Sequence, residues 1–301
     1  EVLGQNLYEF SKSNYFRRPA LSQVKIIARQ LLRAIQFTHS RGIVHCDLKP
    51  ENVLLHPGSN TKIKLIDFGS ACYIGQKHFD YIQSRFYRAP EVMLGIPYGP
   101  PIDMWSFACI IAEFSMGKPL FSGENELHQL QLQIQILGSV PESILAISKR
   151  RSVFYDDDGM IYPIKGHRKR PNSLTLQKAT GITDSDLLDL LEKCLIWDQN
   201  ERITATEALK HDFFTQNAKH NVPRNNDDNC SRTSEVGNTS LKGSPSPEIK
   251  ANSEKLDIPP PKAIDNTPNT QPRSPPGKMR QVSPPARKKS PGTERGALHA
   301  Y

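Results

Sequence analysis

The spacing of apolar residues predicts a long amphipathic helix over residues 21–39. Apolar side chains recur there every three or four positions, as they do along one face of an α-helix. The residues on this face are Val24, Ile27, Ala28, Leu31, Leu32 and Ile35. Residues 102–116 are instead apolar on nearly every face, which predicts a helix buried in the middle of a domain. Further helices are predicted over 126–137, 184–197 and 205–212.

Short runs rich in Val, Leu and Ile predict a small β-hairpin after the first helix. The runs cover residues 53–55 and 63–66, and the turn-forming residues 56–60 (HPGSN) lie between them. The expected fold class is therefore α+β and mainly α-helical.

The composition of the chain changes after about residue 217. Apolar residues become sparse, and proline, serine, asparagine and lysine prevail. Such a segment cannot bury enough apolar surface to offset the entropy that it would lose on ordering. We therefore expect a folded domain over 1–214, followed by a disordered, basic, Pro/Ser-rich tail over 215–301.

Charge and cysteine content exclude several classes of protein. The chain has a net charge of +8, and residues 215–301 hold 14 lysines and arginines against 8 acidic residues. The folded part is thus nearly neutral, which argues against a nucleic-acid-binding surface. The five cysteines show no C-x-x-C spacing, so we expect no disulfide framework, no zinc site and a reducing compartment. Because no run of about 18 apolar residues occurs, we expect no membrane span. The expected location is the cytoplasm, the nucleus or both.

Two neighbouring motifs, HCDLKPEN at 45–52 and DFG at 67–69, indicate the chemistry of the protein. Phosphoryl transfer needs positioning, charge neutralisation and a group that accepts the proton of the attacking hydroxyl. Asp47 is suited to accept that proton and Lys49 to neutralise the moving phosphoryl group. Asn52 and Asp67 are suited to hold Mg²⁺ through oxygen. A single Asp or Asn is more often a turn or a helix cap, but the combination makes chance a poor explanation.

These motifs resemble the catalytic loop and the DFG segment of eukaryotic protein kinases, with Cys46 in place of the usual arginine. The resemblance continues in kinase order with SRFYRAPE at 84–91, DMWSFACI at 103–110, IWD at 196–198 and Arg202. The cysteine variant and the run YIQSRFYRAPE are similar to the dual-specificity tyrosine-regulated kinase (DYRK) family of the CMGC group. The match covers residues 1 to about 214, and residues 148–176 lie where this group carries an insert.

The resemblance implies a kinase-like C-terminal lobe whose small β-hairpin carries the catalytic and metal loops. It implies an ATP- and Mg²⁺-dependent serine/threonine kinase that acts on proteins, with proline after the acceptor residue. Asp47 and Lys49 are then catalytic, and Asn52 and Asp67 bind the metal. Ser70, directly after DFG, favours serine and threonine as substrates, with tyrosine reserved for self-modification.

The resemblance also implies a nucleotide site near the start of the chain. Leu54 is expected to form the floor under the adenine ring, and Glu1 and Leu3 to lie in the hinge whose backbone binds adenine. Asn6 is expected near the ribose, and Glu51 is assigned to the same site. Taken alone, Leu3 and Leu54 are better explained by core packing.

Tyr81 corresponds to the activation-loop tyrosine that DYRK kinases phosphorylate on themselves. Arg85, Arg88 or both are expected to meet the added phosphate. The alternative is an exposed tyrosine beside solvated arginines.

Four further residues are expected to support the architecture. Glu91 and Arg202 resemble a buried ion pair that anchors the substrate loop. Asp103 is expected to accept hydrogen bonds from the backbone of the catalytic loop, and His45 to pack there without taking part in catalysis.

The glycine-rich loop, the strand lysine and the partner glutamate of a small lobe do not occur in the 301 residues. We therefore expect a fragment, or a lone large lobe, with negligible transfer activity by itself. One alternative is a non-catalytic lobe that acts as an interaction or scaffold protein. Another is a small-molecule phosphotransferase, against which the SRFYRAPE loop and the Glu91–Arg202 pair argue because they shape a groove for a peptide.

The tail contains several Ser-Pro sites. Residues 280–284 (RQVSP) combine an upstream arginine with a proline after Ser283, which this kinase family favours. Self-phosphorylation of Ser283 is therefore a hypothesis, and a solvated linker without such a role is the alternative.

Overall fold

The computed structural model describes residues 1–76, 79–164 and 170–215. Its elements in chain order are α1 (Leu7–Ser13), α2 (Leu21–Ser40), β1 (Ile43–Val44), η1 (Pro50–Asn52), β2 (Val53–Leu55), β3 (Ile63–Leu65), β4 (Cys72–Tyr73), η2 (Arg85–Tyr87), α3 (Pro90–Met93), α4 (Pro101–Met116), α5 (Glu126–Leu137), α6 (Glu142–Ala146), α7 (Arg151–Phe154), α8 (Leu176–Thr180), α9 (Ser185–Cys194), α10 (Ala205–Ala208) and α11 (Asp212–Thr215). The predicted tail, from residue 216 on, and Ser283 within it lie outside the described residues. Across the described ranges, no helix has both the length and the apolar character needed to cross a membrane.

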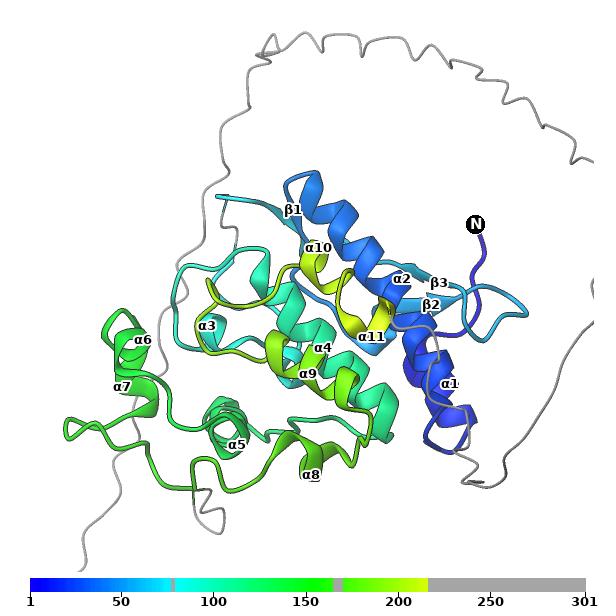
Figure 1. Cartoon of the computed structure of the whole chain (residues 1–301). Coiled ribbons are helices and arrows are strands. Elements are labelled where there is room, and N and C mark those ends of the chain that lie inside the picture. Colours follow the sequence, from blue (N-terminus) through cyan, green and yellow to red (C-terminus); the bar gives the residue numbers. More distant parts are fainter. Residues whose placement is uncertain (77–78, 165–169, 216–301) are drawn as a thin grey trace, which may run out of the picture. The chain divides into compact units, whose positions relative to one another are not determined.

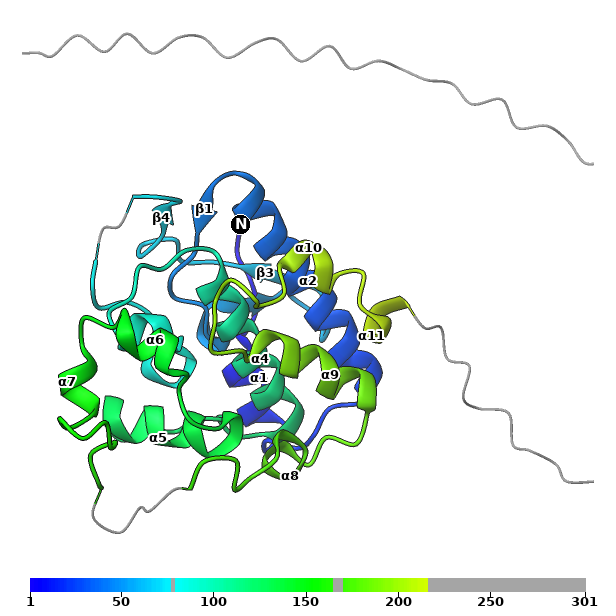
Figure 2. The same cartoon turned by 60° about the vertical axis from the view of Figure 1, so that its left-hand side comes forward.

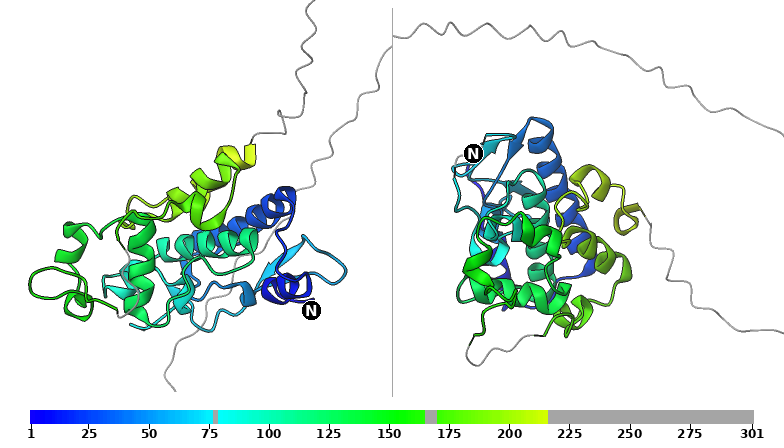
Figure 3. Two further views of the ribbon diagram at one scale, coloured as in Figure 1. Left: turned by 90° about the horizontal axis from the view of Figure 1, so that it is seen from below. Right: turned by 90° about the vertical axis from the view of Figure 1, so that its left-hand side faces the viewer.

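Helix α4 lies in the middle of the fold (Figures 1 and 2) and packs against α2, α8 and α9. Nearly every residue of α4 is buried, as its sequence predicted. Seen from below, α2 runs beside α4 (Figure 3). The predicted apolar face of α2, from Val24 to Ile35, is buried against α4 and the other elements that α2 contacts, so the amphipathic helix is confirmed.

A second apolar cluster joins α3 and the residues after it to α5, α6 and α7. Met93, Leu94, Leu130, Phe154 and Trp197 are among its buried residues. Figures 1 and 2 show α6 and α7 near α5, on the side of α4 that faces away from α2. Phe154 and Tyr155, which belong to the expected insert, are buried in this cluster, so the insert packs against α3 and α5.

Two short antiparallel ladders set the positions of both motif loops. Strands β2 and β3 form the predicted hairpin, in which Val53 pairs with Leu65 and Leu55 with Ile63. Strands β1 and β4 form a second ladder, which the sequence did not reveal, with Val44 paired to Cys72. The loop with the HCDLKPEN motif, called the catalytic loop here after the resemblance, therefore connects β1 to β2, and the DFG segment connects β3 to β4. The mainly helical α+β class with small antiparallel sheets is confirmed.

Several helix boundaries differ from the prediction. The helix expected over 184–197 ends at Cys194, and the Ile196 carbonyl accepts hydrogen bonds from the Arg202 side chain. The helix expected over 205–212 is two short helices, α10 and α11, of which the first begins with a capping box between Thr204 and Glu207. Helix α1 was missed, although Asn6 and Glu9 form a capping box at its start.

A buried ion pair ties the residues after α9 to α3. Nη1 and Nη2 of Arg202 lie 2.7 Å and 3.0 Å from the two carboxylate oxygens of Glu91. Arg202 also donates to the carbonyls of Pro101 and Ile196, and its guanidinium lies 5.2 Å from the ring centre of Trp105. Because each remaining donor has a partner, the pair satisfies the conditions under which a buried charge is tolerated.

We predict that Glu91→Ala lowers the free energy of unfolding by about 3–5 kcal/mol, because it leaves the Arg202 charge buried without its counter-ion. Denaturant unfolding followed by tryptophan fluorescence measures the change. The matched control is Glu142→Ala, which breaks the exposed pair with Arg151 and is expected to cost roughly 0–1 kcal/mol. Equal costs for the two variants would contradict the anchoring role of Glu91.

Candidate active site

Asp103, in the first turn of α4, holds the backbone of the catalytic loop. Its Oδ2 accepts a hydrogen bond from the His45 N–H at 2.8 Å, and its Oδ1 accepts one from the Cys46 N–H at 3.1 Å. Oδ2 also lies 2.9 Å from Nε2 of His39. Cys46 has a φ of +67°, a left-handed conformation that disfavours a residue with a Cβ. The two bonds to Asp103 help to maintain this strained backbone.

His45 connects the catalytic loop to the DFG segment. Its side chain is buried, its Nε2 lies 3.0 Å from the Ile66 carbonyl, and its Nδ1 accepts a hydrogen bond from the Asp47 N–H at 3.3 Å. The ring centre is 4.8 Å from that of Phe68. Both ring nitrogens therefore have backbone partners, one in the catalytic loop and one directly before DFG.

The carboxylate of Asp47 is fixed from both sides. Nζ of Lys49 lies 2.6 Å from Oδ2, while Oδ1 accepts hydrogen bonds from the N–H and the hydroxyl of Ser84 at 3.2 Å and 3.0 Å. The bond to Asp47 is the main reason why the pKa of Lys49 is raised. Sequence reasoning missed Ser84, whose only signal was its place at the start of the SRFYRAPE motif. The site therefore presents a positioned carboxylate beside an ammonium group.

Asn52 and Asp67 are brought together by the β2–β3 ladder. The Ile66 N–H donates to the Asn52 carbonyl at 3.0 Å, directly before Asp67. Nδ2 of Asn52 donates to the Asp47 carbonyl at 2.8 Å, which directs the amide. Asp67 has a φ of +62°, and its Oδ1 accepts a hydrogen bond from the Gly69 N–H.

This donor set fits Mg²⁺, which prefers oxygen ligands, takes only one or two carboxylates and completes its shell with water and phosphate. Asn52 and Asp67 supply an amide oxygen and a carboxylate. Within the described residues, no group of three or more His, Cys, Asp or Glu side chains could hold a metal by itself.

Residues 1–6 lie beside β2, as a hinge next to the predicted adenine floor would. The Gly4 N–H donates to the Leu55 carbonyl at 2.8 Å, and an isolated bridge pairs Asn6 with Leu54. Glu1 forms an ion pair with Lys64, and this bond is the main reason why the pKa of Glu1 is lowered. Asn6 caps α1, its Oδ1 accepting a hydrogen bond from the Glu9 N–H at 2.8 Å. The contacts of Glu1, Leu3, Asn6 and Leu54 with a nucleotide stay predictions.

A cavity of about 310 Å³ is lined in part by Ser84, whose hydroxyl is bonded to Asp47. Its lining residues are Tyr8, Glu51, Ser84, Arg85, Phe86, Tyr87, Glu113 and Pro119. The structure thus places Glu51, which was assigned to the nucleotide site, in a cavity that also contains Glu113. Sequence reasoning missed Glu113 because it lies within the apolar helix α4.

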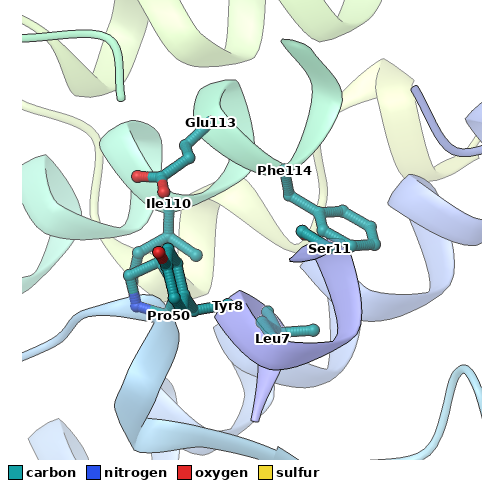
Figure 4. Close-up of a pocket in the computed structure, with 7 residues that line it drawn as sticks. All are labelled: Leu7, Tyr8, Ser11, Pro50, Ile110, Glu113 and Phe114. Carbon is teal, nitrogen blue, oxygen red and sulfur yellow. The ribbon is translucent and has the colours of Figure 1, made fainter. Parts of the chain in front are cut away.

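Glu113 has an unusual environment for a carboxyl group. Burial raises its pKa to about 7, and the hydroxyl of Tyr87 donates to Oε2 at 2.8 Å. Figure 4 shows Glu113 extending from α4 over a smaller neighbouring pocket, opposite Tyr8 of α1 and Pro50 of η1. A cation entering this region would stabilise the ionised carboxylate.

Arg88 organises the residues between Tyr81 and α3, which the resemblance assigns to the activation segment. Its guanidinium is buried and lies 4.0 Å from the ring centre of the exposed Tyr81, whose pKa is lowered mainly by this arginine. Arg88 also forms an ion pair with Glu126 at 3.0 Å. Nη1 of Arg85 points elsewhere and donates to the Glu124 carbonyl at 2.6 Å. Of the two predicted arginines, Arg88 is the one in contact with the Tyr81 ring.

Gln83 is a second organiser that the sequence did not reveal. It is buried and has a φ of +62°, and its carbonyl accepts hydrogen bonds from Nε and Nη2 of Arg88 at 3.2 Å and 2.7 Å. Its side chain donates to the Ile102 carbonyl and to Ser106, and it accepts a bond from the Ala89 N–H. These contacts fix the segment between Tyr81 and α3 against α4.

Comparison with known proteins shows what this arrangement is similar to. Residues 4–214 match the family model described as protein kinase domain. The chain is 44% identical to the fission yeast DYRK-family kinase pom1 over 75% of its length, which is 21% of that protein. It is 41% identical to dual specificity tyrosine-phosphorylation-regulated kinase 2 of Drosophila melanogaster, covering 72% of this chain and 31% of the relative. It is 44% identical to human dual specificity tyrosine-phosphorylation-regulated kinase 4, covering 72% of this chain and 42% of the relative. The chain thus spans between about a fifth and two fifths of these relatives.

We predict that Glu113→Gln removes a pH-dependent loss of stability. The folded chain holds the Glu113 proton up to about pH 7, whereas the unfolded chain releases it near the ordinary carboxyl pKa of 4.5. The unfolding free energy therefore falls between these two pH values. The penalty is absent below pH 4.5 and full above pH 7, at about 3 kcal/mol at most. The stability of the variant relative to the native chain should rise by up to this amount between pH 4.5 and pH 8 in denaturant unfolding.

Tyr87→Phe is the matched control for this measurement. It removes the hydrogen bond that favours ionised Glu113, so it should move the pH transition upward and not abolish it. If the native chain and Glu113→Gln show parallel profiles of stability against pH, the raised pKa of Glu113 is contradicted.

Proposed function

The chain belongs to the protein kinase domain family, and from that membership we propose that it is the hinge and large lobe, over 1–214, of a DYRK-type protein kinase. The proposed reaction transfers the γ-phosphoryl group of ATP to serine or threonine hydroxyls of proteins. Protein kinase domains generally use ATP and Mg²⁺. The observation that carries the proposal is the fixed Asp47 carboxylate, held by Lys49 and Ser84 next to Asn52 and Asp67.

Each of these residues has a role that follows from its position. Asp47 orients the substrate hydroxyl and accepts its proton, and the Ser84 hydroxyl bonded to Oδ1 demonstrates that this oxygen can receive an O–H donor. Lys49 neutralises negative charge on the transferred group. Asn52 and Asp67 would hold Mg²⁺, which when bound with ATP neutralises charge on the phosphates. His45 and Asp103 act by fixing the loop.

Gln83 and Arg88 support a preference for proline directly after the acceptor residue. In an extended substrate chain, the backbone N–H of that residue needs an acceptor as it loses water. The left-handed Gln83 turns its carbonyl into the bonds with Arg88, so this carbonyl has donors already. Proline has no N–H, so it loses no hydrogen bond with water at this position. Any other residue leaves a backbone donor unpaired, at a cost of about 1–3 kcal/mol.

Glu51 and Glu113 support recognition of a basic side chain in the substrate. Both carboxyl groups line the cavity that Ser84 also lines. The one cation in the lining, Arg85, donates to the carbonyls of Gly123 and Glu124. An upstream arginine of a peptide would supply the counter-ion that this cavity needs, in agreement with the RQVSP sequence around Ser283.

Three finer features belong to the same proposal. Tyr81 is proposed as a site of self-phosphorylation, because its ring lies on the buried Arg88. Substrates are proposed to be cytoplasmic or nuclear proteins. The 301 residues alone are proposed to be inactive, because the sequence has no glycine-rich loop to cover the phosphates.

We predict that the polypeptide in which this chain occurs in the cell phosphorylates peptides with a Ser-Pro acceptor. Asp47→Asn should lower kcat by roughly 10²–10⁴-fold, because it removes the proton acceptor. Replacing the proline of the peptide by alanine should lower kcat/KM by about 10–100-fold. Radiolabelled phosphate transfer, with the native protein isolated from its own cells, measures both effects. The control variant is Asp158→Asn, an exposed acidic residue in the insert, which should retain full activity.

The results separate the enzyme from the scaffold alternative. Transfer that does not depend on Asp47 would sink the catalytic assignment and favour a non-catalytic interaction protein. Asp47-dependent transfer by the 301 residues alone would overturn only the proposal that they are inactive.

A further inference from the structure

A cluster of three charged side chains lies behind Tyr81 and joins three separate segments. Arg88 follows η2, Glu126 begins α5, and Arg150 directly precedes α7. Oε1 of Glu126 lies 3.0 Å from Nη1 of Arg88 and 3.2 Å from Nη1 of Arg150. Oε2 of the same carboxylate lies 2.7 Å from Nη2 of Arg150. One carboxylate is therefore shared by two guanidinium groups.

The Arg150 side chain is held in this position by contacts with the backbone and with an aromatic ring. Its Nη1 donates to the Met93 carbonyl at 2.9 Å, and its backbone N–H donates to the Leu94 carbonyl. Its guanidinium lies 5.6 Å from the ring centre of Phe154. Gly95, with a φ of +69°, leaves room for the arginine, because a Cβ there would lie 3.0 Å from its Cγ. The side chain is still 34% exposed.

The phenol of Tyr81 extends into the same group of charges. Its ring lies 4.0 Å from the Arg88 guanidinium, and Arg150 and Tyr81 also interact electrostatically. Phosphorylation transfers a phosphoryl group from ATP to the phenolic oxygen, and ADP and the phenolic proton leave. The product carries a charge of about −1.5 to −2 and several strong acceptors. It therefore competes with Glu126 for both arginines.

We propose that Arg150 is part of the receptor for a phosphate on Tyr81, and that Glu126 occupies this receptor until the phosphate arrives. The phosphate takes over bonds from Arg88 and Arg150 that now go to the Glu126 carboxylate. Phosphorylation of Tyr81 then links the insert, through Arg150 and α7, to the activation segment. Arg85 adds positive charge nearby, but its Nη1 is bonded to backbone carbonyls.

The inference rests on the proposed modification of Tyr81 but not on the catalytic activity of this chain. The test therefore introduces phosphotyrosine at position 81 of the 301-residue chain by genetic encoding. The second pKa of the phosphate, near 6 when free, is followed by ³¹P NMR. In the native chain the two arginines should lower this pKa by one unit or more, because they favour the dianion.

Arg150→Ala should return the phosphate pKa toward its free value by about 0.5–1 unit. The matched control is Arg151→Ala, its neighbour in sequence, which pairs with the exposed Glu142 and should leave the titration unchanged. Glu126→Gln keeps the size of the side chain and removes the competing charge, so it should lower the phosphate pKa further. This second variant also keeps the test decisive if Arg150→Ala fails to fold.

Identical titrations for the native chain and Arg150→Ala would overturn the proposal, as would a rise of the phosphate pKa in Glu126→Gln. A titration that responds to Arg88→Lys but not to any change at position 150 or 126 would assign the receptor to the activation segment alone. Failure of the chain to phosphorylate Tyr81 itself affects the proposed function and leaves these results standing.

Discussion

The candidate site depends on the hydrogen bonds between the Asp103 carboxylate and the backbone of the catalytic loop. Cys46 adopts a left-handed conformation, which an isolated chain would leave, and the Asp103 carboxylate accepts hydrogen bonds from the N–H groups of His45 and Cys46. Asp47 follows directly, so its direction is set by this strained turn. Asp103 is itself fixed because it lies in the first turn of α4, the helix around which the domain packs. The apolar core thus determines the direction of a partly exposed carboxylate.

The arrangement of the segments around Tyr81 depends on Arg88, a buried cation with three kinds of partner. It holds the Gln83 carbonyl, the Glu126 carboxylate and the Tyr81 ring. A buried charge is stable only when its partners remain in place, so these three segments cannot move independently. The position of the Gln83 carbonyl and the environment of the Tyr81 ring therefore both depend on one guanidinium group.

The sequence predicted the elements whose pattern is local and long. The α2 face and the fully apolar α4 were clear because many residues repeat one periodicity, and the β2–β3 hairpin because its turn is marked. The β1–β4 ladder was missed because each strand has two residues, too few to show a period. The early end of α9 was missed because a carbonyl of Ile196 is required by Arg202.

The motif residues of the site were also visible in sequence, but their neighbours were not. Ser84, Glu113 and Glu126 gain their roles from contacts with residues that are far away along the chain, and no spacing rule indicates such contacts. The charged residues of the site and its supports also differ in how deeply they are buried. Asp103 and Arg202 are almost fully enclosed, while the Asp47 and Lys49 side chains keep about a fifth of their surface exposed. Groups that contact a substrate must stay partly exposed. Their geometry therefore has to be fixed by other groups that are enclosed.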